Sequence, residues 1–330
     1  MRWLEAVRRG AVFCVVALLV VWAGYGFEYG PLPPGMGWYE PPAKTLVAKA
    51  QPAVKQVVAR RNLPAPAFVR GMIDLVRHNA QGHEAYLLGE VKTSGWWYYF
   101  PVALVVKTTL PLLLLATLAI VVWLAGRGGR QPILYPMLGV AAILVVCLPS
   151  SMNIGIRHIL PVYPFLALTA AGLFGGLRLR PPAARLVMGV AAALVVWHGG
   201  ESLLAHPDYL AYFNQVARGR EEHYLLDSNL DWGQDLGRLQ RYLQAHGVDR
   251  VYLSYFGTTD PAVLGLAGAR PLPAEGRPSG WIAVSKSHLA GLYTKKGTDL
   301  SWLKSHTPAA RIGKSMLLYY ISEESAGAAR

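Results

Sequence analysis

Five apolar stretches dominate the pattern of hydrophobic and polar positions along the chain. Each is close to the about 20 residues that a helix needs to cross the hydrocarbon core of a bilayer. The fifth is the least apolar because it carries His198 and Glu201. The pattern predicts a multi-pass α-helical membrane protein with about five transmembrane helices, at residues 11–27, 101–125, 132–148, 159–177 and 186–204.

The first stretch has features of both a signal peptide and a membrane anchor. Arg2, Arg8 and Arg9 precede the apolar run, as they would in a signal peptide. The run continues through Trp22 and Phe27 without a cleavage site of the Ala-x-Ala type. We therefore expect residues 1–27 to form a retained transmembrane anchor.

The positive charge is concentrated in short segments between the apolar stretches. The chain has a net charge of +13, whereas residues 206–330 contain 14 basic and 12 acidic residues. Three alternate segments carry net +7, as the positive-inside rule requires of cytoplasmic segments. They contain Arg2, Arg8 and Arg9 with Glu5, then Arg127 and Arg130, then Arg178, Arg180 and Arg185. The pattern predicts a plasma (inner) membrane protein with its N-terminus inside and its C-terminus outside, and no basic face for nucleic acid.

The predicted outer segment, residues 28–97, begins with prolines and then becomes helical. Residues 46–58 and 68–76 both place apolar side chains on one helical face beside basic residues. Such helices lie on a membrane surface or pack against protein, and the sequence leaves both alternatives open. The aromatic run at residues 96–100 is typical of the headgroup level and precedes a four-helix transmembrane region, residues 98–205.

Residues 206–330 are less apolar and predict a small extracytoplasmic α/β domain. We expect strands at residues 224–226, 251–255, 281–285 and 316–321, in parallel βαβ units. Asp231 is the expected cap of a helix over residues 232–245, and Asp260 with Pro261 predicts a second helix start. No glycine-rich phosphate fingerprint follows a strand, which disfavours nucleotide binding.

Three segments resemble the C-terminal half of bacterial membrane glycosyltransferases of the GT-C type. They are residues 95–111 (GWWYYFPVALVVKTTLP), residues 153–165 (NIGIRHILPVYPF) and residues 206–236 (HPDYLAYFNQ through DSNLDWGQDL). The resemblance is to the protein O-mannosyltransferase-like family, similar to glycosyltransferase family 39. It implies transfer of a sugar from a polyprenyl-phosphate donor to an acceptor at the outer face of the membrane, as in protein glycosylation of the cell envelope.

The resemblance leaves the catalytic residues unknown. In the family the catalytic acid lies in the first outer loop, near the start of a chain with a longer hydrophobic part. Glu28 corresponds to the middle of the family's chain and is not a candidate for that acid. The alternative is a non-catalytic membrane subunit that binds polyprenyl-phosphate lipid and completes an enzyme whose N-terminal half is a separate chain. A transporter is disfavoured because charge within the apolar stretches is sparse.

Three basic residues are candidates for binding the lipid phosphate. Arg157 and His158 lie where a short outer segment enters the fourth apolar stretch, and a guanidinium suits phosphate because it is planar and always charged. Lys107 lies about 12 Å along a helix from the aromatic run. Anchoring to ordinary anionic lipid explains Arg157 and His158 equally well, and snorkelling explains Lys107.

Acidic and amide side chains alternate at Asp227, Asn229 and Asp231. An EF-hand is excluded, because its sixth position would be Trp232 and its twelfth Arg238. A different divalent metal site stays open, and we expect a capped turn. In a glycosyltransferase, Trp232 could stack on a sugar, or it could belong to the core. The candidates for binding a sugar or acceptor are Asp227, Asn229, Asp231, Trp232, Gln234 and Asp235.

Overall fold

The computed structural model describes residues 2–35, 51–53, 55–56, 58, 61–128, 133–175, 177–294 and 298–323. The chain forms two compact units, Met1–Gly82 and His83–Arg330.

The described part of the first unit includes the helices α1 and α3 and a short antiparallel ladder. Helix α1 (Arg2–Gly24) is followed by a turn in which Trp22 Nε1 donates a hydrogen bond of 2.8 Å to the carbonyl of Glu28. Strands β1 (Tyr29–Gly30) and β2 (Leu63–Pro64) pair, and helix α3 (Pro66–Gln81) follows. Helix α3 confirms the helix predicted over residues 68–76. The stripe predicted over residues 46–58 lies largely outside the described residues.

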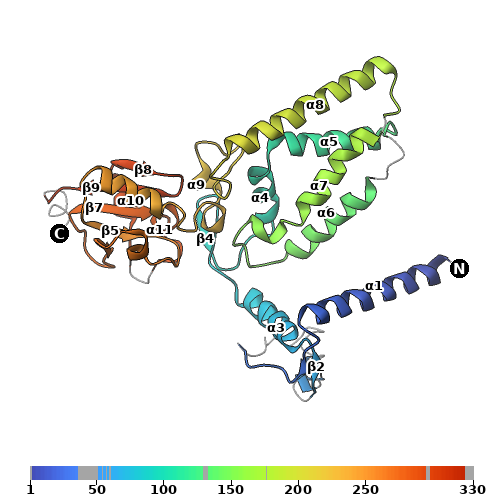
Figure 1. Ribbon diagram of the computed structural model, residues 1–330, viewed down its shortest axis with the longest axis horizontal. Coiled ribbons are helices and arrows are strands. Elements are labelled where there is room, and N and C mark those ends of the chain that lie inside the picture. Colours follow the sequence, from blue (N-terminus) through green and yellow to red (C-terminus); the bar gives the residue numbers. More distant parts are fainter. Residues whose placement is uncertain are drawn as a thin grey trace. The chain divides into compact units, whose positions relative to one another are not determined.

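The second unit begins with a hairpin and continues with a helical region. In Figure 1, helix α7 lies beside α5 and α6, and α8 packs along α5. The elements are β3 (Ala85–Leu87), β4 (Glu90–Lys92), α4 (Tyr99–Lys107), α5 (Leu110–Leu124), α6 (Leu134–Cys147), η1 (Ile156–Ile159), α7 (Val162–Ala171), η2 (Gly172–Gly175), α8 (Pro181–Leu204) and α9 (Glu221–Tyr224).

Helices α4 and α5 form a broken pair, bent by 110°. Pro111 has no N–H to donate to the carbonyl of Lys107, so the helix cannot continue across this point. Asn214 satisfies the carbonyls that are freed at the break. Its Nδ2 donates to the carbonyls of Val105 at 2.5 Å and Thr108 at 2.7 Å, and its N–H donates to Val106. The loop after α8 therefore stabilises the end of α4.

Two described helices are long and apolar enough to cross a membrane, Val7–Gly24 within α1 and all of α8. The pair α4 and α5 is a third candidate if it forms a single broken span, while α6 and residues 162–175 are shorter apolar helices. The polar residues of α8 have partners: Thr109 Oγ1 lies 2.7 Å from His198 Nδ1, and Tyr212 donates to Glu201 at 3.2 Å. The chain is a helical, membrane-associated protein with two or three candidate spans. The predicted five spans and their orientation stay predictions.

A five-stranded mixed sheet, in the order β6-β5-β7-β9-β8, forms the rest of the second unit. Strand β5 pairs in parallel with β6 and β7, whereas β9 pairs antiparallel with β7 and β8. Leu236, Leu239 and Leu243 of α10 pack against one face of the sheet. The elements are α10 (Leu236–Ala245), β5 (Val251–Ser254), η4 (Pro261–Leu264), β6 (Ala269–Pro271), β7 (Gly280–Ser285), α11 (Lys286–Leu289), η5 (Ser301–Ser305), β8 (Ala310–Ile312) and β9 (Met316–Ile321).

Most predicted elements of this sheet region are present, and three predictions are wrong. Residues 224–226 are not a strand: Tyr224 ends α9, and Leu225 and Leu226 insert into a core with Tyr99 and Phe100. The helix predicted over residues 232–245 begins only at Leu236, because a turn held by side chains precedes it. The expected parallel arrangement holds for β5, β6 and β7 but not for β9. Asp260 caps η4 as predicted, accepting a hydrogen bond from the N–H of Ala262.

The aromatic run at residues 96–100 is mostly inside the protein. Trp97 is 69% exposed, whereas Trp96, Tyr99 and Phe100 are buried. These three pack with the hairpin residue Leu87 in one core cluster. An aromatic belt at the headgroups is therefore the wrong interpretation for the three buried rings, which instead connect the helical region to the segment that follows α9.

Candidate functional site

Asn229 joins the three segments that carry the resemblance. Its Nδ2 donates to Tyr99 Oη at 2.9 Å, and its Oδ1 accepts from the N–H of Ile156 at 2.9 Å. Lys107 Nζ donates to its carbonyl at 2.6 Å. Asn229 is only 1% exposed. Its side chain therefore holds residues 95–111, 153–165 and 206–236 together and is directed at protein groups.

Two glycines allow the backbone to pack closely against side chains at this junction. Gly155 has a φ of 148°, and a Cβ there would meet Ser228 Oγ, which donates to the carbonyl of Ile154. Gly95 has a φ of 66°, and a Cβ there would meet the side chain of Asn153. Asn153 Oδ1 accepts from the N–H of Trp96 at 2.6 Å. Only glycine combines these φ values with such close approach.

Lys107 is enclosed by protein. Besides its bond to Asn229, Nζ donates to the carbonyl of Leu210 at 2.7 Å and lies 4.2 Å from the centre of the Phe213 ring. The residue is 9% exposed. Two carbonyl dipoles and an aromatic face compensate for the loss of hydration of this ammonium group. Lys107 is thus a buried part of the junction, bonded to the backbone of Asn229 and Leu210.

Arg157, the residue after Ile156, meets Trp232 on the surface. The guanidinium carbon of Arg157 lies 5.3 Å from the centre of the Trp232 ring, within cation–π range. Trp232 is 44% exposed, so it is not a core residue. Its ring is 5.2 Å from that of Phe256, which stacks on Tyr293 at 5.2 Å. An exposed cation therefore stands at one end of a row of three aromatic rings.

Asp227 lies near the other end of this row. It is 4% exposed, has a φ of 56°, and its Oδ2 accepts from Tyr293 Oη at 3.1 Å. Burial raises the pKa of Asp227 to about 6, although the nearby guanidinium of Arg157 opposes the shift. Tyr293 is itself held in place, because its N–H donates to Glu84 at 2.7 Å. Asp227 therefore orients a ring of the aromatic row and is little exposed to solvent.

His158 follows Arg157 but takes a different direction. Its ring lies 6.3 Å from that of Phe100. Partial burial and the neighbouring charge of Arg157 lower the pKa of His158 below its usual value. At neutral pH, Arg157 is therefore the permanent cation of this pair.

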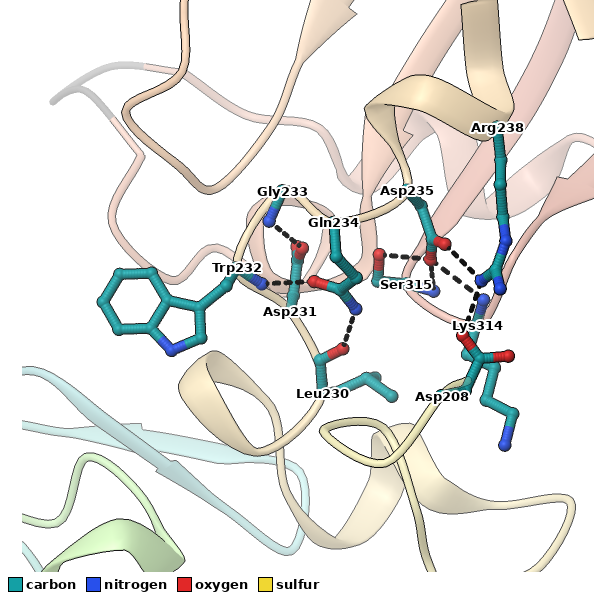
Figure 2. A network of polar contacts seen from close by, with 10 residues as sticks. All are labelled: Asp208, Leu230, Asp231, Trp232, Gly233, Gln234, Asp235, Arg238, Lys314 and Ser315. Carbon is teal, nitrogen blue, oxygen red and sulfur yellow. Dashed lines mark hydrogen bonds and ion pairs between the residues drawn. The ribbon is translucent and has the colours of Figure 1, made fainter. Parts of the chain in front are cut away.

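Asp231, Trp232, Gly233 and Gln234 form a tight turn (Figure 2). Asp231 Oδ1 accepts from the N–H of Gly233 at 2.9 Å, and Gln234 Oε1 accepts from the N–H of Trp232 at 2.7 Å. Gln234 Nε2 closes the turn by donating to the carbonyl of Leu230 at 2.8 Å. The turn is capped as expected, and it leaves the Trp232 ring pointing away from the other labelled side chains.

The carboxyl of Asp231 is fully buried and only partly paired. Oδ2 has no hydrogen-bond partner among the described residues. Burial raises the pKa of Asp231 to about 6. Burial therefore favours the protonated form of this carboxyl group.

Asp235 directly precedes α10, and both of its carboxylate oxygens are paired. Its Oδ2 accepts from the N–H groups of Lys314 at 3.0 Å and Ser315 at 2.9 Å, and from Ser315 Oγ at 2.8 Å. Its Oδ1 pairs with Arg238 Nη1 at 2.7 Å, and Arg238 also pairs with Asp208 (Figure 2). Asp235 is 0% exposed and anchors the start of α10 to the turn between β8 and β9.

The alternating side chains do not converge on a metal site. Asp227 is directed to Tyr293, Asn229 to the junction, and Asp231 to its own turn. Among the described residues, no group of three or more His, Cys, Asp or Glu side chains could hold a metal ion.

The structure adds partners that the sequence did not indicate. Phe256 and Tyr293 complete the aromatic row, and Tyr99 and Asn153 hold the junction. Phe256 follows strand β5, a position that could have drawn attention to it, since ligands gather at the carboxyl ends of parallel strands. Tyr293 carries no such signal, because only the fold brings it to Asp227.

Comparisons with known proteins identify no relative of this chain. No family model matches the chain, and neither a curated protein nor a solved structure matches it. The geometry of residues 95–111, 153–165 and 206–236 is therefore the basis of the functional argument.

Proposed function

We propose that the chain is the C-terminal portion of a glycosyltransferase that moves a sugar from a polyprenyl-phosphate carrier to an acceptor at the outer membrane face. The observation that carries the proposal is the junction at Asn229. Three segments far apart in the sequence resemble the same family, and they meet at one place through Tyr99, Lys107 and Ile156. Segments that share one chemical task need such proximity.

Arg157 and Trp232 supply groups that suit a lipid-linked sugar. A guanidinium forms charge-assisted hydrogen bonds with phosphate oxygens, including those of a departing phosphate. The exposed face of Trp232 offers an apolar surface on which a sugar ring can stack, next to that cation. In this proposal Arg157 binds the phosphate, Trp232 contacts the sugar, and Asp227 orients Tyr293 behind them.

The proposal includes the topology of five spans with the N-terminus inside and residues 206–330 outside. The three basic segments on one side and the charge-balanced C-terminal part support it. It places Arg157 and Trp232 at the outer surface of the plasma (inner) membrane. A reporter fused after Arg330 should be active only in an extracytoplasmic compartment, and cytoplasmic activity would overturn the orientation.

The functional test is Arg157→Ala in a reconstituted assembly that uses a polyprenyl-phosphate sugar. Loss of one charged contact with phosphate should lower kcat/KM for the donor by about tenfold or more. Arg241→Ala is the matched control, because Arg241 is an exposed arginine on α10. Equal donor kinetics in the two variants would remove Arg157 from the donor site.

A second candidate function is a non-catalytic subunit that binds polyprenyl-phosphate lipid and completes a split enzyme. The burial of the carboxylates at the site favours it: Asp227, Asp231 and Asp235 are all under 5% exposed and directed at protein groups. Transfer needs a carboxylate that can reach the acceptor. Co-purification with another multi-span protein, and activity only in its presence, would favour the subunit. Transfer by this chain alone would exclude it.

A further inference from the structure

A cavity of about 690 Å³ opens in the sheet region of the second unit. It lies at the carboxyl ends of the three parallel strands: Ser254 ends β5, Leu272 follows β6, and His288 follows β7. Its volume falls within the range of about 300–1,000 Å³ that small-molecule sites occupy. The cavity therefore has the size and position of a binding site.

The strand order makes this end of the sheet a switch point. The chain passes from β5 outward to β6 and then returns across β5 to form β7 on its other side. Loops that leave adjacent parallel strands in opposite directions open a crevice between them, and α/β proteins bind ligands there. The cavity occupies this crevice, so its position follows from the topology of the sheet.

A neutral polar pair lines the cavity. His288 Nδ1 lies 2.9 Å from Ser254 Oγ. Burial lowers the pKa of His288 to about 4, so the imidazole is uncharged at neutral pH and has one donor and one acceptor nitrogen. The described residues give its Nε2 no hydrogen-bond partner. A polar group of this kind in a lined cavity favours a ligand that supplies hydrogen bonds.

The remaining lining restricts the class of ligand. Tyr255 and Tyr293 contribute aromatic surface, and Asp260 and Arg270 contribute opposite charges. Among the described lining residues, the charges are balanced and the imidazole is neutral, which favours neither an anion nor a cation. A purely apolar ligand would leave His288 Nε2 without a partner, which costs binding free energy. A neutral molecule with several hydroxyl groups and an apolar ring face satisfies both parts of the lining.

We propose that this cavity binds a neutral saccharide of one or two rings, with its hydroxyl groups on Ser254 and His288 and a ring face against Tyr255 or Tyr293. Tyr293 also belongs to the row with Trp232, so the saccharide site adjoins the Arg157 site through one shared side chain. The saccharide site stands independently of the proposed glycosyl transfer, because it rests on the cavity and not on Arg157.

The test is a titration of the full chain in detergent with methyl glycosides of glucose, galactose, mannose and N-acetylglucosamine and with their disaccharides. Saturation-transfer NMR reports binding, and calorimetry gives the Kd. We expect saturable binding of at least one saccharide, and a Kd about tenfold higher in His288→Ala. His246→Ala is the matched control, because His246 is exposed on the surface beside α10 and outside the cavity.

A second variant keeps the test decisive if His288→Ala fails to fold. Ala274 lines the cavity from an exposed position, so Ala274→Trp should fill the space without disturbing the sheet and abolish binding. The proposal is overturned if no saccharide binds the wild type, if inorganic phosphate or benzoate displaces the saccharide, or if Ala274→Trp binds normally. Donor kinetics of Arg157→Ala are measured separately, so either proposal can fail without the other.

Discussion

The helical region and the sheet region of the second unit direct their aliphatic side chains in opposite ways. In the helical region, Val145 on α6 is 66% exposed and Val196 on α8 is 75% exposed. In the sheet region, Ile282 and Leu318 are completely buried. Exposed aliphatic side chains on successive helices are costly in water and favourable against lipid.

Buried polar groups are paired with protein groups in both regions. In the helical region Lys107 and Glu201 are directed inward and paired with carbonyls or hydroxyls. In the sheet region the buried carboxylate of Asp235 is surrounded by donors from the turn between β8 and β9 and from α10. The comparison teaches that the two regions are built for different solvents, and that the candidate site lies where the two kinds of packing meet.

The largest expected effect is in the sheet region. Asp235→Ala leaves the N–H groups of Lys314 and Ser315 without their acceptor, while Arg238 keeps its pair with Asp208, and each buried donor left unpaired costs about 1–3 kcal/mol. Amide hydrogen exchange of β7 and β9 should show the loss of stability. The control Asp249→Ala, at an exposed site, should change the free energy of unfolding by less than about 0.5 kcal/mol. Equal amide exchange rates of β7 and β9 in Asp235→Ala and Asp249→Ala would contradict the anchoring role of Asp235.

Two valines of similar exposure, one in each region, test whether that region contacts lipid or water. Val196 on α8 and Val263 on η4 are 75% and 79% exposed. Val196→Asp should disfavour membrane insertion of α8 by up to about 3 kcal/mol, while Val263→Asp should change stability by less than about 0.5 kcal/mol. A glycosylation-based insertion assay measures the first and thermal unfolding the second. Normal insertion of Val196→Asp would mean that this face of α8 does not contact lipid.

The buried carboxyl of Asp231 predicts a pH dependence. Its pKa is raised to about 6 from the ordinary 3.8, so the folded state binds this proton more tightly than the unfolded state does. Its contribution to stability is therefore present at about pH 4 and is lost as the pH rises through 6, by about 2–3 kcal/mol. Thermal unfolding from pH 4 to 7 should show a shallower decline in Asp231→Asn. If the unfolding temperature fell equally with pH in wild type and Asp231→Asn, the raised pKa of Asp231 would be contradicted.

The smallest expected effect on stability is at Trp232, which is half-exposed. Trp232→Ala should leave the thermal midpoint nearly unchanged, and it should raise the Kd for a polyprenyl-phosphate sugar by about threefold to tenfold through loss of the stacking surface. Tyr320→Ala removes an aromatic ring that is 59% exposed on β9 and serves as the control. A large loss of stability with unchanged binding would make Trp232 a packing residue.

Local patterns predicted the elements whose side chains alternate or repeat regularly. The strand expected at residues 316–321 has the bounds of β9, and the one at residues 281–285 lies within β7. The start of α10 was missed because Asp231 and Gln234 satisfy the backbone of their own turn, which competes with helix formation. The break after Lys107 comes from Pro111 and is stabilised by Asn214, more than 100 residues away. Hydropathy registers neither effect, so it predicted one continuous stretch.

In the candidate site, too, local sequence predicts some features and contacts with distant residues decide others. Arg157 and Trp232 were both candidates from the sequence, and the structure brings them together. Asn229 and Asp235 were expected to face a ligand, yet both are turned towards protein. Residue type and spacing indicate which groups can do chemistry, whereas the direction of a buried side chain is fixed by partners such as Tyr99 and Ser315 that lie far away in the sequence.

The most direct test of the account is binding of a polyprenyl phosphate to the chain in lipid nanodiscs. The account predicts saturable binding by the wild type, a Kd about tenfold higher in Arg157→Ala, and an unchanged Kd in Arg241→Ala. Saturable binding that is equal in all three proteins would show that Arg157 is not the phosphate contact. Absence of saturable binding by the wild type would contradict a lipid-phosphate site at the junction of the two regions.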